Sequence, residues 1–466
     1  MVEAAVRLSA VPAPRLVSLL GLGFGDCGKG LFTDALCRRW PVQAVVRFNG
    51  GAQAGHNVVL PDGRHHTFSQ FGSGSFVPGV ATVLAEPVVV HPSALQIEAD
   101  RLVAAGVGDA RQRLLIDARC RVNTPFHQAA GRLRELRRGV AAHGTCGVGV
   151  GETARHALVC PENVLRYGDL RRPARAMQQL EAIRRDLLTE WVDEAPPASA
   201  GNAAAEYRLL DDAELGERWL TAIQPLLRAA PPLPSEQIAE HLSRAGTVLF
   251  EGAQGILLDE WYGFHPHTTW STLHPGAVET VASAYGLSGR VEHLGILRAY
   301  LTRHGQGPLP TADAALSDLP EPHNAGEGWQ GAFRRGHPDG LLLAYALAVS
   351  GPLNGLLVSH LDVFERSAAL RWCEAYRVAP EVIQARLCRV VTSAPERVIG
   401  LNLPPEKDLA HQAALTQLLF SARPEYDPEY LQSPAALLER IEALAACRVR
   451  LTSRGPTHEA VSGMVE

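Results

Sequence analysis

The chain has 466 residues, 46% of them hydrophobic, which is enough for one large α/β domain with additions or for two or three domains. Its formal net charge of −5 argues against nucleic-acid or membrane binding as the main function, and no apolar run reaches the roughly 18 residues that span a bilayer. The eight cysteines include no Cys-x-x-Cys pair, which predicts free thiols in a reducing cytoplasm rather than disulfides or a zinc site.

The chain begins with residues 1–15, which are too polar and proline-rich for a secretory signal and are expected to form a flexible leader. A predicted strand at residues 16–22 is followed by glycine-rich GFGDCGKG and by a helix from about residue 31. Gly23, Gly28 and Lys29 have the spacing of a phosphate-binding loop, in which backbone N–H groups and a helix N-terminus bind phosphate oxygens. Lys29 is one of only two lysines in the chain.

This loop departs from the usual form at two positions. Gly30 stands where a Ser or Thr usually binds magnesium, and Asp26 would repel phosphate unless it has a task of its own. A dinucleotide-binding loop is the alternative, since Gly21 and Gly23 begin its fingerprint, but Asp26 occupies its third glycine position. The next strand also ends at Asn49 rather than at an acid that could bind ribose, so the spacing favours the phosphate loop.

Two further glycine-rich segments follow. The strand at residues 45–48 leads to paired glycines and to His56, which is well placed to donate to a developing oxyanion, although a hydrogen-bonded loop histidine gives the same pattern. Residues 80–102 predict a strand, a turn and a helix capped near Ser93. The alternating glycines of residues 143–151 indicate either backbone packed against a ligand or a flexible surface loop. Residues 190–210 read as an exposed insertion.

In the second half, buried strands end in polar residues. The strand at residues 247–252 leads to Gln254, and carboxyl ends of such strands line the ligand crevice of open α/β sheets. His265 and His267 lack a third metal ligand at helical spacing. Arg334 and the arginine after it could bind phosphate or carboxylate, or form a solvated charge run. Asp362, at the end of a strand at residues 354–364, could accept from guanine or cap a helix. A helix at 434–446, a strand at 449–452 and a turn at 453–456 end the fold.

Six segments occur in a fixed order: GFGDCGKG, FNGGAQAGHNVV, LFEGAQGILLD, GILRAYLTRHGQGPLPT, VSHLDVF and TSRGP. They resemble the adenylosuccinate synthetase family, and the similarity covers residues 16–456. The resemblance implies an α/β fold with a large, mostly parallel sheet flanked by helices, in one catalytic domain at residues 16–456 followed by a tail at 457–466. It also implies a cytoplasmic homodimer that binds small molecules and neither nucleic acid nor membranes.

That family binds GTP and magnesium, phosphorylates the 6-oxo group of IMP and lets the amine of aspartate displace the phosphate. The resemblance implies that Asp26 is the base and touches magnesium, that His56 stabilises phosphoryl transfer, and that Gly55 offers a magnesium-binding carbonyl. Lys29 matches the loop lysine, and ATP is the alternative donor. The other residues implied to bind substrate or nucleotide are Gly25, Gly28, Gly30, Gln53, Thr145, Cys146, Gln254, Thr269, Trp329, Arg334, Arg335, Asp362, Ser453 and Gly455.

The sequence departs from the family pattern near these residues. Cys27 replaces a carboxylate, Leu31 a lysine, Gln53 an asparagine, Cys146 a threonine and Val148 an arginine. The family's TTGR loop, which binds the carboxylates of aspartate, is replaced by NAGEGWQGAFRRG at residues 324–336. The residues at the TTGR positions are Gly328, Trp329, Gln330 and Gly331.

Three hypotheses follow from these departures. The first is a divergent adenylosuccinate synthetase whose aspartate clamp is rebuilt around Arg334 or Arg335. The second is a paralogue that keeps the phosphorylation chemistry but joins a different amine, or uses a different oxo or carboxyl substrate. A non-catalytic nucleotide-binding regulator is the third, and it would need neither a base nor His56. Arg155 and Arg166 are the candidates for the arginine that the family lends across its dimer interface.

Overall fold

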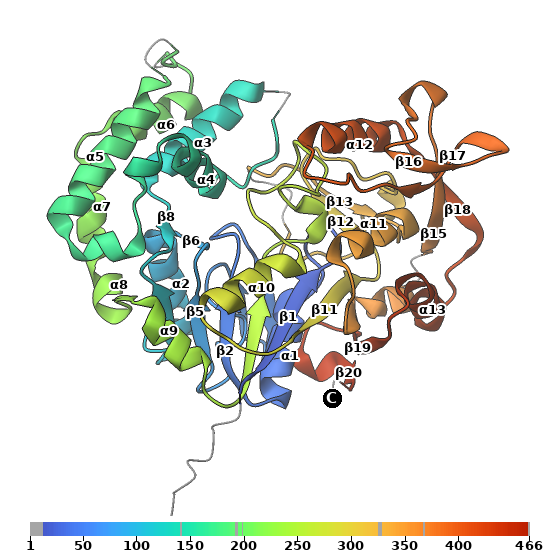
Figure 1. The fold of residues 1–466 in the computed structure, drawn as a ribbon, viewed down its shortest axis with the longest axis horizontal. Coiled ribbons are helices and arrows are strands. Elements are labelled where there is room, and N and C mark those ends of the chain that lie inside the picture. Colours follow the sequence, from blue (N-terminus) through green and yellow to red (C-terminus); the bar gives the residue numbers. More distant parts are fainter. Residues whose placement is uncertain are drawn as a thin grey trace, which may run out of the picture.

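A computed structural model describes residues 13–139, 142–191, 194–197, 199–324, 329–366 and 369–464 (Figure 1). Its centre is a ten-stranded sheet in the order β20-β19-β14-β11-β1-β10-β2-β5-β7-β9. Its neighbouring strands are parallel except for β19 with β20, which confirms the predicted α/β fold. The strands are β1 (Arg15–Gly21), β2 (Val42–Arg47), β5 (Ala81–Leu84), β7 (Leu114–Asp117), β9 (Pro232–Leu233), β10 (Thr247–Glu251), β11 (Val291–Arg298), β14 (Gly355–Ser359), β19 (Val449–Ser453) and β20 (Val461–Gly463).

Strand β1 lies in the middle of the sheet and is covered on both faces. Leu16 and Leu20 pack with α9 (Ser235–Leu242) and α10 (Pro275–Ala284), whereas Val17 and Leu19 pack with α1 (Lys29–Arg39) on the opposite face. This double burial explains the continuous apolar run of β1, because a parallel strand inside an α/β sheet meets apolar surface on both sides.

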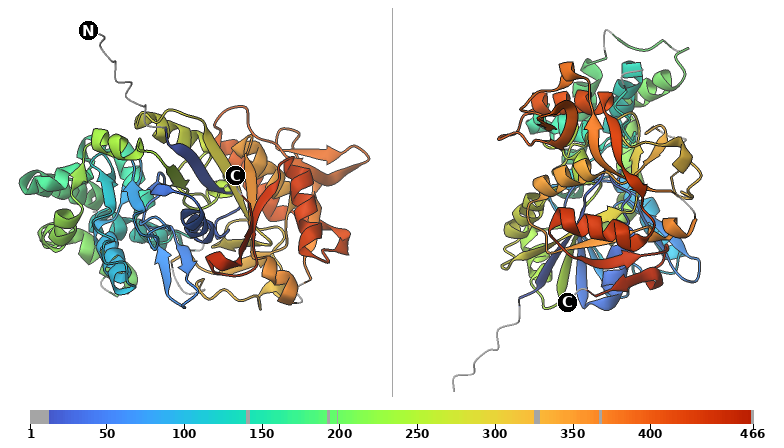
Figure 2. Two further views of the ribbon diagram at one scale, coloured as in Figure 1. Left: turned by 90° about the horizontal axis from the view of Figure 1, so that it is seen from below. Right: turned by 90° about the vertical axis from the view of Figure 1, so that its right-hand side faces the viewer.

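Two smaller parts lie at either end of the sheet (Figures 1 and 2). At one end are the helices α2 (Pro92–Ala104), α3 (Pro125–Arg138), α4 (Val150–Val159), α5 (Pro173–Thr189), α6 (Asn202–Asp211), α7 (Leu215–Ala222) and α8 (Gln224–Ala229). At the other end, α11 (Gly340–Ser350), α12 (Leu409–Ser421) and α13 (Pro434–Ala445) accompany an antiparallel sheet of β15 (Arg371–Arg377), β16 (Cys388–Val391), β17 (Ala394–Leu401) and β18 (Arg423–Tyr430).

Short paired strands complete the fold. They are β3 (His56–Val59) with β4 (His65–Phe68), β6 (Val89–Val90) with β8 (Arg121–Val122), and β12 (Leu301–His304) with β13 (Phe333–Gly336). In the described part of the chain, no helix is both long and apolar enough to cross a membrane.

Several predicted boundaries are wrong. The expected tail contributes β20, which pairs with β19, so the central sheet continues to Gly463. Within the expected exposed insertion, α6 is an ordered helix whose Leu210 is buried in the core of the helical part. Asp362 does not end a strand, because β14 stops at Ser359 and Asp362 lies in the 3₁₀ helix Leu361–Arg366. Residues 1–12 of the expected leader lie outside the described residues, and Arg15 already belongs to β1.

Candidate active site

A cavity of about 770 Å³ opens at the carboxyl ends of six neighbouring strands, β19, β14, β11, β1, β10 and β2. The segment after each strand contributes to its wall, as expected for ligand crevices in open α/β sheets. The predicted residues that line this cavity are Gly25, Asp26, Gly28, Lys29, Gly30, Gln53, Gly55, His56, Thr145, Cys146, Gln254, Thr269, Asp362 and Gly455. Four predicted residues are not part of its lining, namely Trp329, Arg334, Arg335 and Ser453.

The glycine-rich loop between β1 and α1 turns through left-handed backbone. Gly25, Asp26 and Gly28 have φ values of 106°, 46° and 91°, and Gly28 caps α1 without a side chain. The N-terminus of α1 therefore opens directly onto the cavity, where its first N–H groups are free to bind an anion.

Close packing explains why Gly30 replaces the usual hydroxyl residue. A Cβ atom at position 30 would lie 2.6 Å from the carbonyl oxygen of Asn57, because β3 passes directly over the start of α1. No Cβ can approach a backbone oxygen that closely, so a serine or threonine cannot occupy this position without moving β3.

Asp26 lies between cations at the cavity wall. Its Oδ2 is 3.3 Å from Nε2 of His304, and Arg298 donates from Nη1 to the Asp26 carbonyl at 3.2 Å. Burial alone would raise the pKa of the Asp26 carboxyl. The hydrogen bond and charge of His304, together with the charges of Arg298 and Lys29, outweigh burial and lower this pKa. Asp26 is therefore an ionised proton acceptor at neutral pH.

His56 is held from behind by a buried carboxylate. Its Nδ1 lies 2.7 Å from Oε1 of Glu251, and Oε2 of the same carboxylate accepts the backbone N–H of Ser73 at 3.0 Å. Burial lowers the pKa of His56 to about 4 despite the opposing effect of Glu251, so the ring is neutral at pH 7. The ring thus donates from Nδ1–H to Glu251, and its buried Nε2 has no hydrogen-bond partner among the described residues.

Polar groups at the cavity wall also lack partners. Both amide atoms of Gln53 and the amide oxygen of Gln254 are buried without a hydrogen-bond partner in the part of the chain that the structure describes. Each such group costs about 1–3 kcal/mol when it stays unpaired. Lys29 donates from Nζ to the backbone carbonyl of Gln254 at 2.5 Å, and its Nζ is 3.6 Å from Sγ of Cys27. This wall is therefore suited to a polar ligand that pairs these groups.

The arginines predicted to clamp aspartate are engaged elsewhere. Arg334 donates to the carbonyls of Gly305 and Gly307, and Arg335 donates from Nη2 to the carbonyl of Leu319 at 2.7 Å. Neither residue lines the cavity, because both side chains hold neighbouring loops in place.

Arg303 lines the cavity together with Arg298 and Arg366. It stacks 4.0 Å over the ring of Phe24 and donates to the carbonyls of Pro308 at 2.8 Å and His267 at 3.0 Å. Burial lowers the pKa of Arg303, and the nearby charge of Arg334 adds to this effect. No carboxylate of the described residues lies within ion-pair distance of Arg303, so a negatively charged ligand group would find a cation here.

The remaining predicted residues have structural or peripheral positions. The ring of Trp329 packs so closely on Gly147 that a Cβ atom at position 147 would collide with it. The guanidinium carbon of Arg132 lies over this ring, 5.4 Å from its centroid. Gly328, also in the altered loop, lies outside the described residues. Ser453 is buried and donates to the Gly455 carbonyl at 2.6 Å, which shapes the turn there. Ser453 thus supports the cavity edge without lining it.

The loop that contributes Thr145 and Cys146 is tied down by α3. Glu135 accepts the backbone N–H of Gly144 at 2.6 Å and that of Thr145 at 3.1 Å. Burial raises the pKa of the Cys146 thiol, so it is protonated at neutral pH. At the opposite edge, Asp362 forms an ion pair with Arg366, in which Oδ2 and Nη2 are 3.2 Å apart.

The candidates for an arginine shared across a dimer are paired within the chain. Arg155 binds Glu152 and Glu190, and Arg166 donates from Nη1 to the Arg119 carbonyl at 2.7 Å. His265 and His267 belong to no group of three potential metal ligands among the described residues.

The cavity residues that sequence reasoning missed include Arg298, Arg303, His304 and His360. The signal was present for the first three, since they lie in the stretch GILRAYLTRHG, where Arg298 ends β11 and the other two lie in β12. His360 has a φ of 61° immediately after β14, which turns it toward Tyr300 on the cavity wall. Glu251 was placed near the crevice, but its contact with His56 spans 195 positions and has no local pattern.

Comparison with known proteins identifies the family. Residues 18–462 match the family described as adenylosuccinate synthetase. The adenylosuccinate synthetase of Thioalkalivibrio sulfidiphilus is 33% identical to this chain, and the match covers 77% of this chain and 80% of the relative. The protein of the same name from Azotobacter vinelandii is 30% identical, and the match covers 94% of this chain and 96% of the relative.

Solved structures agree in fold. The adenylosuccinate synthetase of Plasmodium falciparum has a TM-score of 0.75 at 18% identity, covering 97% of this chain and 100% of that one. Cyanophage S-2L succinoaminodeoxyadenylate synthetase has a TM-score of 0.59 at 16% identity, covering 98% and 97%. The chain therefore belongs to the adenylosuccinate synthetase family of GTP-dependent ligases, which form C–N bonds.

Proposed function

We propose that the protein transfers the terminal phosphoryl group of GTP to the 6-oxo group of an IMP-like purine nucleotide, and that an amine then displaces the phosphate. The observation that carries this proposal is the content of one cavity beside a phosphate loop. It holds both an ionised Asp26 and a buried Nε2 of His56 that has no hydrogen-bond partner in the described part of the chain. A protein that only binds nucleotides needs neither group, so this pair supports an enzyme over a regulator.

The chemistry requires both groups. A purine 6-oxo oxygen is amide-like and leaves poorly, whereas phosphate leaves readily. Asp26 takes the N1 proton, which makes O6 nucleophilic toward the terminal phosphorus of GTP. After transfer, the amine attacks C6, the C6–O bond breaks, inorganic phosphate leaves, and the amine loses a proton. The enzyme contributes mainly position and charge to these steps.

His304 positions the base. Its contact occupies Oδ2 of Asp26 and leaves Oδ1 to accept the proton from N1. The His304 ring also packs against Phe333, with ring centroids 4.7 Å apart, which limits its rotation. His56 acts on the phosphoryl group: the negative charge of the bound phosphoryl group raises the pKa of the ring, so Nε2 takes up a proton from water. It then donates to a phosphoryl oxygen while Glu251 stabilises the imidazolium.

The donor atoms at this wall fit Mg²⁺. The carboxylate of Asp26 and the backbone carbonyl of Gly55 line the same cavity, and both are hard oxygen ligands. These two residues would hold the ion, which neutralises phosphoryl charge when bound. Lys29 lies at the same wall and adds a second positive charge.

Aspartate is the first candidate for the amine, as in the family. A different amine is the second candidate, favoured by the engagement of Arg334 and Arg335 with backbone carbonyls. Of the three arginines at the cavity wall, Arg298 pairs with Glu321 and Arg366 with Asp362. Arg303 therefore offers one cation, which suits one carboxylate. A second carboxylate left unpaired in the site would cost about 1–3 kcal/mol or more.

The phosphate donor is tested together with the amine. Asp362 is the proposed guanine acceptor, and its pairing with Arg366 must loosen for that contact. The cyanophage protein is described as bound to dGMP and to dATP as an energy donor, so both nucleotide pairs belong in the test.

The experiment incubates the protein with Mg²⁺, GTP or ATP, IMP or GMP, and a panel of amines, and measures phosphate release and product mass. We expect release that requires both a purine monophosphate and an amine. Triphosphate binding without release under any combination would support the regulator instead. Release with aspartate alone would exclude the paralogue that joins a different amine.

A further inference from the structure

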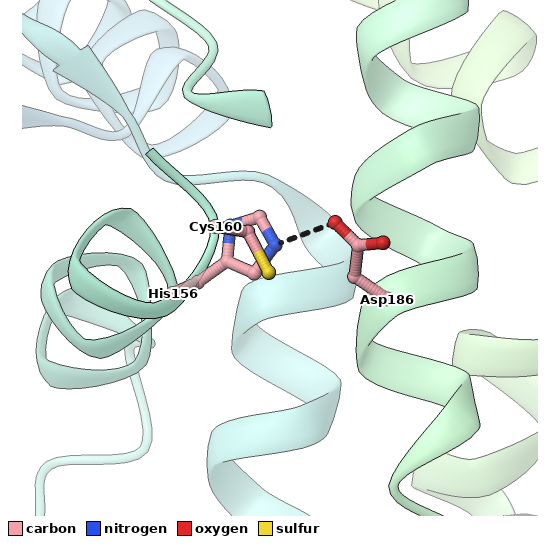
Figure 3. A group of neighbouring side chains, drawn as sticks. All are labelled: His156, Cys160 and Asp186. Atoms are coloured by element: carbon pink, nitrogen blue, oxygen red, sulfur yellow. Dashed lines mark hydrogen bonds and ion pairs between the residues drawn. The ribbon is translucent and has the colours of Figure 1, made fainter. Parts of the chain in front are cut away.

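A group of three potential metal ligands lies among the helices α2 to α8 (Figure 3). His156 is on α4, Cys160 follows at the end of that helix, and Asp186 is on α5. One donor atom from each lies within 4.8 Å of the other two. None of these three residues lines the cavity or has a role in the proposed reaction.

The sequence builds this group in two steps. His156 and Cys160 are four positions apart at the end of a helix, so their side chains share one face. Helix α5 then brings Asp186 to that face, with its Oδ2 3.2 Å from Nε2 of His156. Tetrahedral zinc, with bonds of roughly 2.0–2.3 Å, separates its ligand atoms by roughly 3.3–3.7 Å, close to this spacing.

Asp186 has an outer partner that orients it. Asn163 donates from Nδ2 to Oδ2 of Asp186 at 2.6 Å. Outer hydrogen bonds to ligating carboxylates are regular features of protein metal sites, because they fix the orientation of the ligand.

We propose that His156, Cys160 and Asp186 bind a zinc ion. Imidazole nitrogen, thiolate sulfur and carboxylate oxygen together suit Zn²⁺, whereas Mg²⁺ prefers oxygen ligands alone. Three protein ligands leave the fourth tetrahedral position to water. This site is separate from the proposed Mg²⁺ position at Asp26. The proposal departs from the expectation that the cysteines form no zinc site, which no local spacing could suggest because Asp186 is distant in sequence.

The position of the site gives the ion a structural task. Residues at the start of α4, Val150 and Gly151, line the cavity, while the zinc ligands join the end of the same helix to α5. Zinc binding would therefore fix the helix that carries part of the cavity wall, without taking part in the reaction.

Cobalt titration of the full-length protein, after removal of metal with a chelator, tests the proposal. Co²⁺ reports a tetrahedral thiolate site through a sulfur-to-cobalt charge-transfer band. We expect this band to saturate at one equivalent, to vanish when Zn²⁺ is added, and to be absent in Cys160→Ser. Cys447→Ser, which removes another partly buried cysteine, should keep it.

Two further variants guard against misfolding of Cys160→Ser. Asp186→Asn should shift the band and weaken cobalt binding, and Asn163→Ala should weaken it about tenfold or more while leaving the ligands intact. Zn²⁺ should raise the Tm of the wild-type protein and not that of Cys160→Ser. No charge-transfer band, or an equal band in Cys160→Ser, would overturn the zinc site and leave His156 and Asp186 as an ordinary ion pair.

Discussion

Asp26 has an unusual backbone conformation, and the charges of its neighbours lower the pKa of its carboxyl. Its φ of 46° lies in the left-handed region, which asparagine adopts as readily as aspartate. Asp26→Asn therefore removes the carboxylate without straining the loop. We expect turnover to fall by about 10²–10⁴-fold with GTP binding nearly unchanged, measured by phosphate release and equilibrium titration. Unchanged turnover would rule out Asp26 as the base.

The pH dependence of catalysis reports the partner of Asp26. Its carboxyl pKa is lowered below the ordinary value, so activity should persist as the pH falls and decline only when the carboxylate becomes protonated. His304→Gln removes a charge and a hydrogen bond, so burial raises this pKa and the acidic limb of kcat against pH should move to higher pH. An acidic limb at the same pH in both proteins would contradict the role of His304.

The glycines between β1 and α1 differ in whether the neighbouring elements leave room for a Cβ atom. A Cβ at Gly30 would meet the Asn57 carbonyl, whereas a Cβ at Gly23 would meet only a Leu301 methyl group at 3.8 Å. We expect Gly30→Ala to lower the free energy of unfolding by about 1–3 kcal/mol and Gly23→Ala to change it little, measured by denaturant unfolding. Equal losses would show that β3 does not constrain α1.

Contiguous elements were predictable from the sequence, and contacts between distant segments were not. Strand β1, the phosphate loop and α1 follow one another, so apolar pattern and glycine spacing identified them. The position of Arg334 depends on the pairing of β12 with β13, where it lies opposite Arg303, and no local pattern reveals which arginine faces the cavity. Helix α6 was missed because the Pro, Ser, Gly and Asn residues at 196–202 indicate a loop, although its alanines favour a helix.

At the scale of the whole molecule, the family resemblance predicts a homodimer. Leu158 and Val159, at the end of α4, are 71% and 64% exposed in the single chain. Adjacent exposed apolar side chains are candidates for a buried interface. We expect a solution mass near twice that of the chain, measured by light scattering, and dissociation by Leu158→Glu. Leu409→Glu, a charge at an exposed leucine on α12, serves as the control. A monomer of the wild-type protein would contradict this prediction.

Transfer of the 6-oxo oxygen tests the central claim most directly. An IMP substrate that carries a heavy oxygen isotope at its 6-oxo position is converted with GTP, Mg²⁺ and the amine found active, and the released phosphate is analysed by mass spectrometry. If O6 is phosphorylated and the amine then displaces phosphate, the label leaves C6 and appears in the phosphate in proportion to product. Turnover that yields unlabelled phosphate would contradict the account.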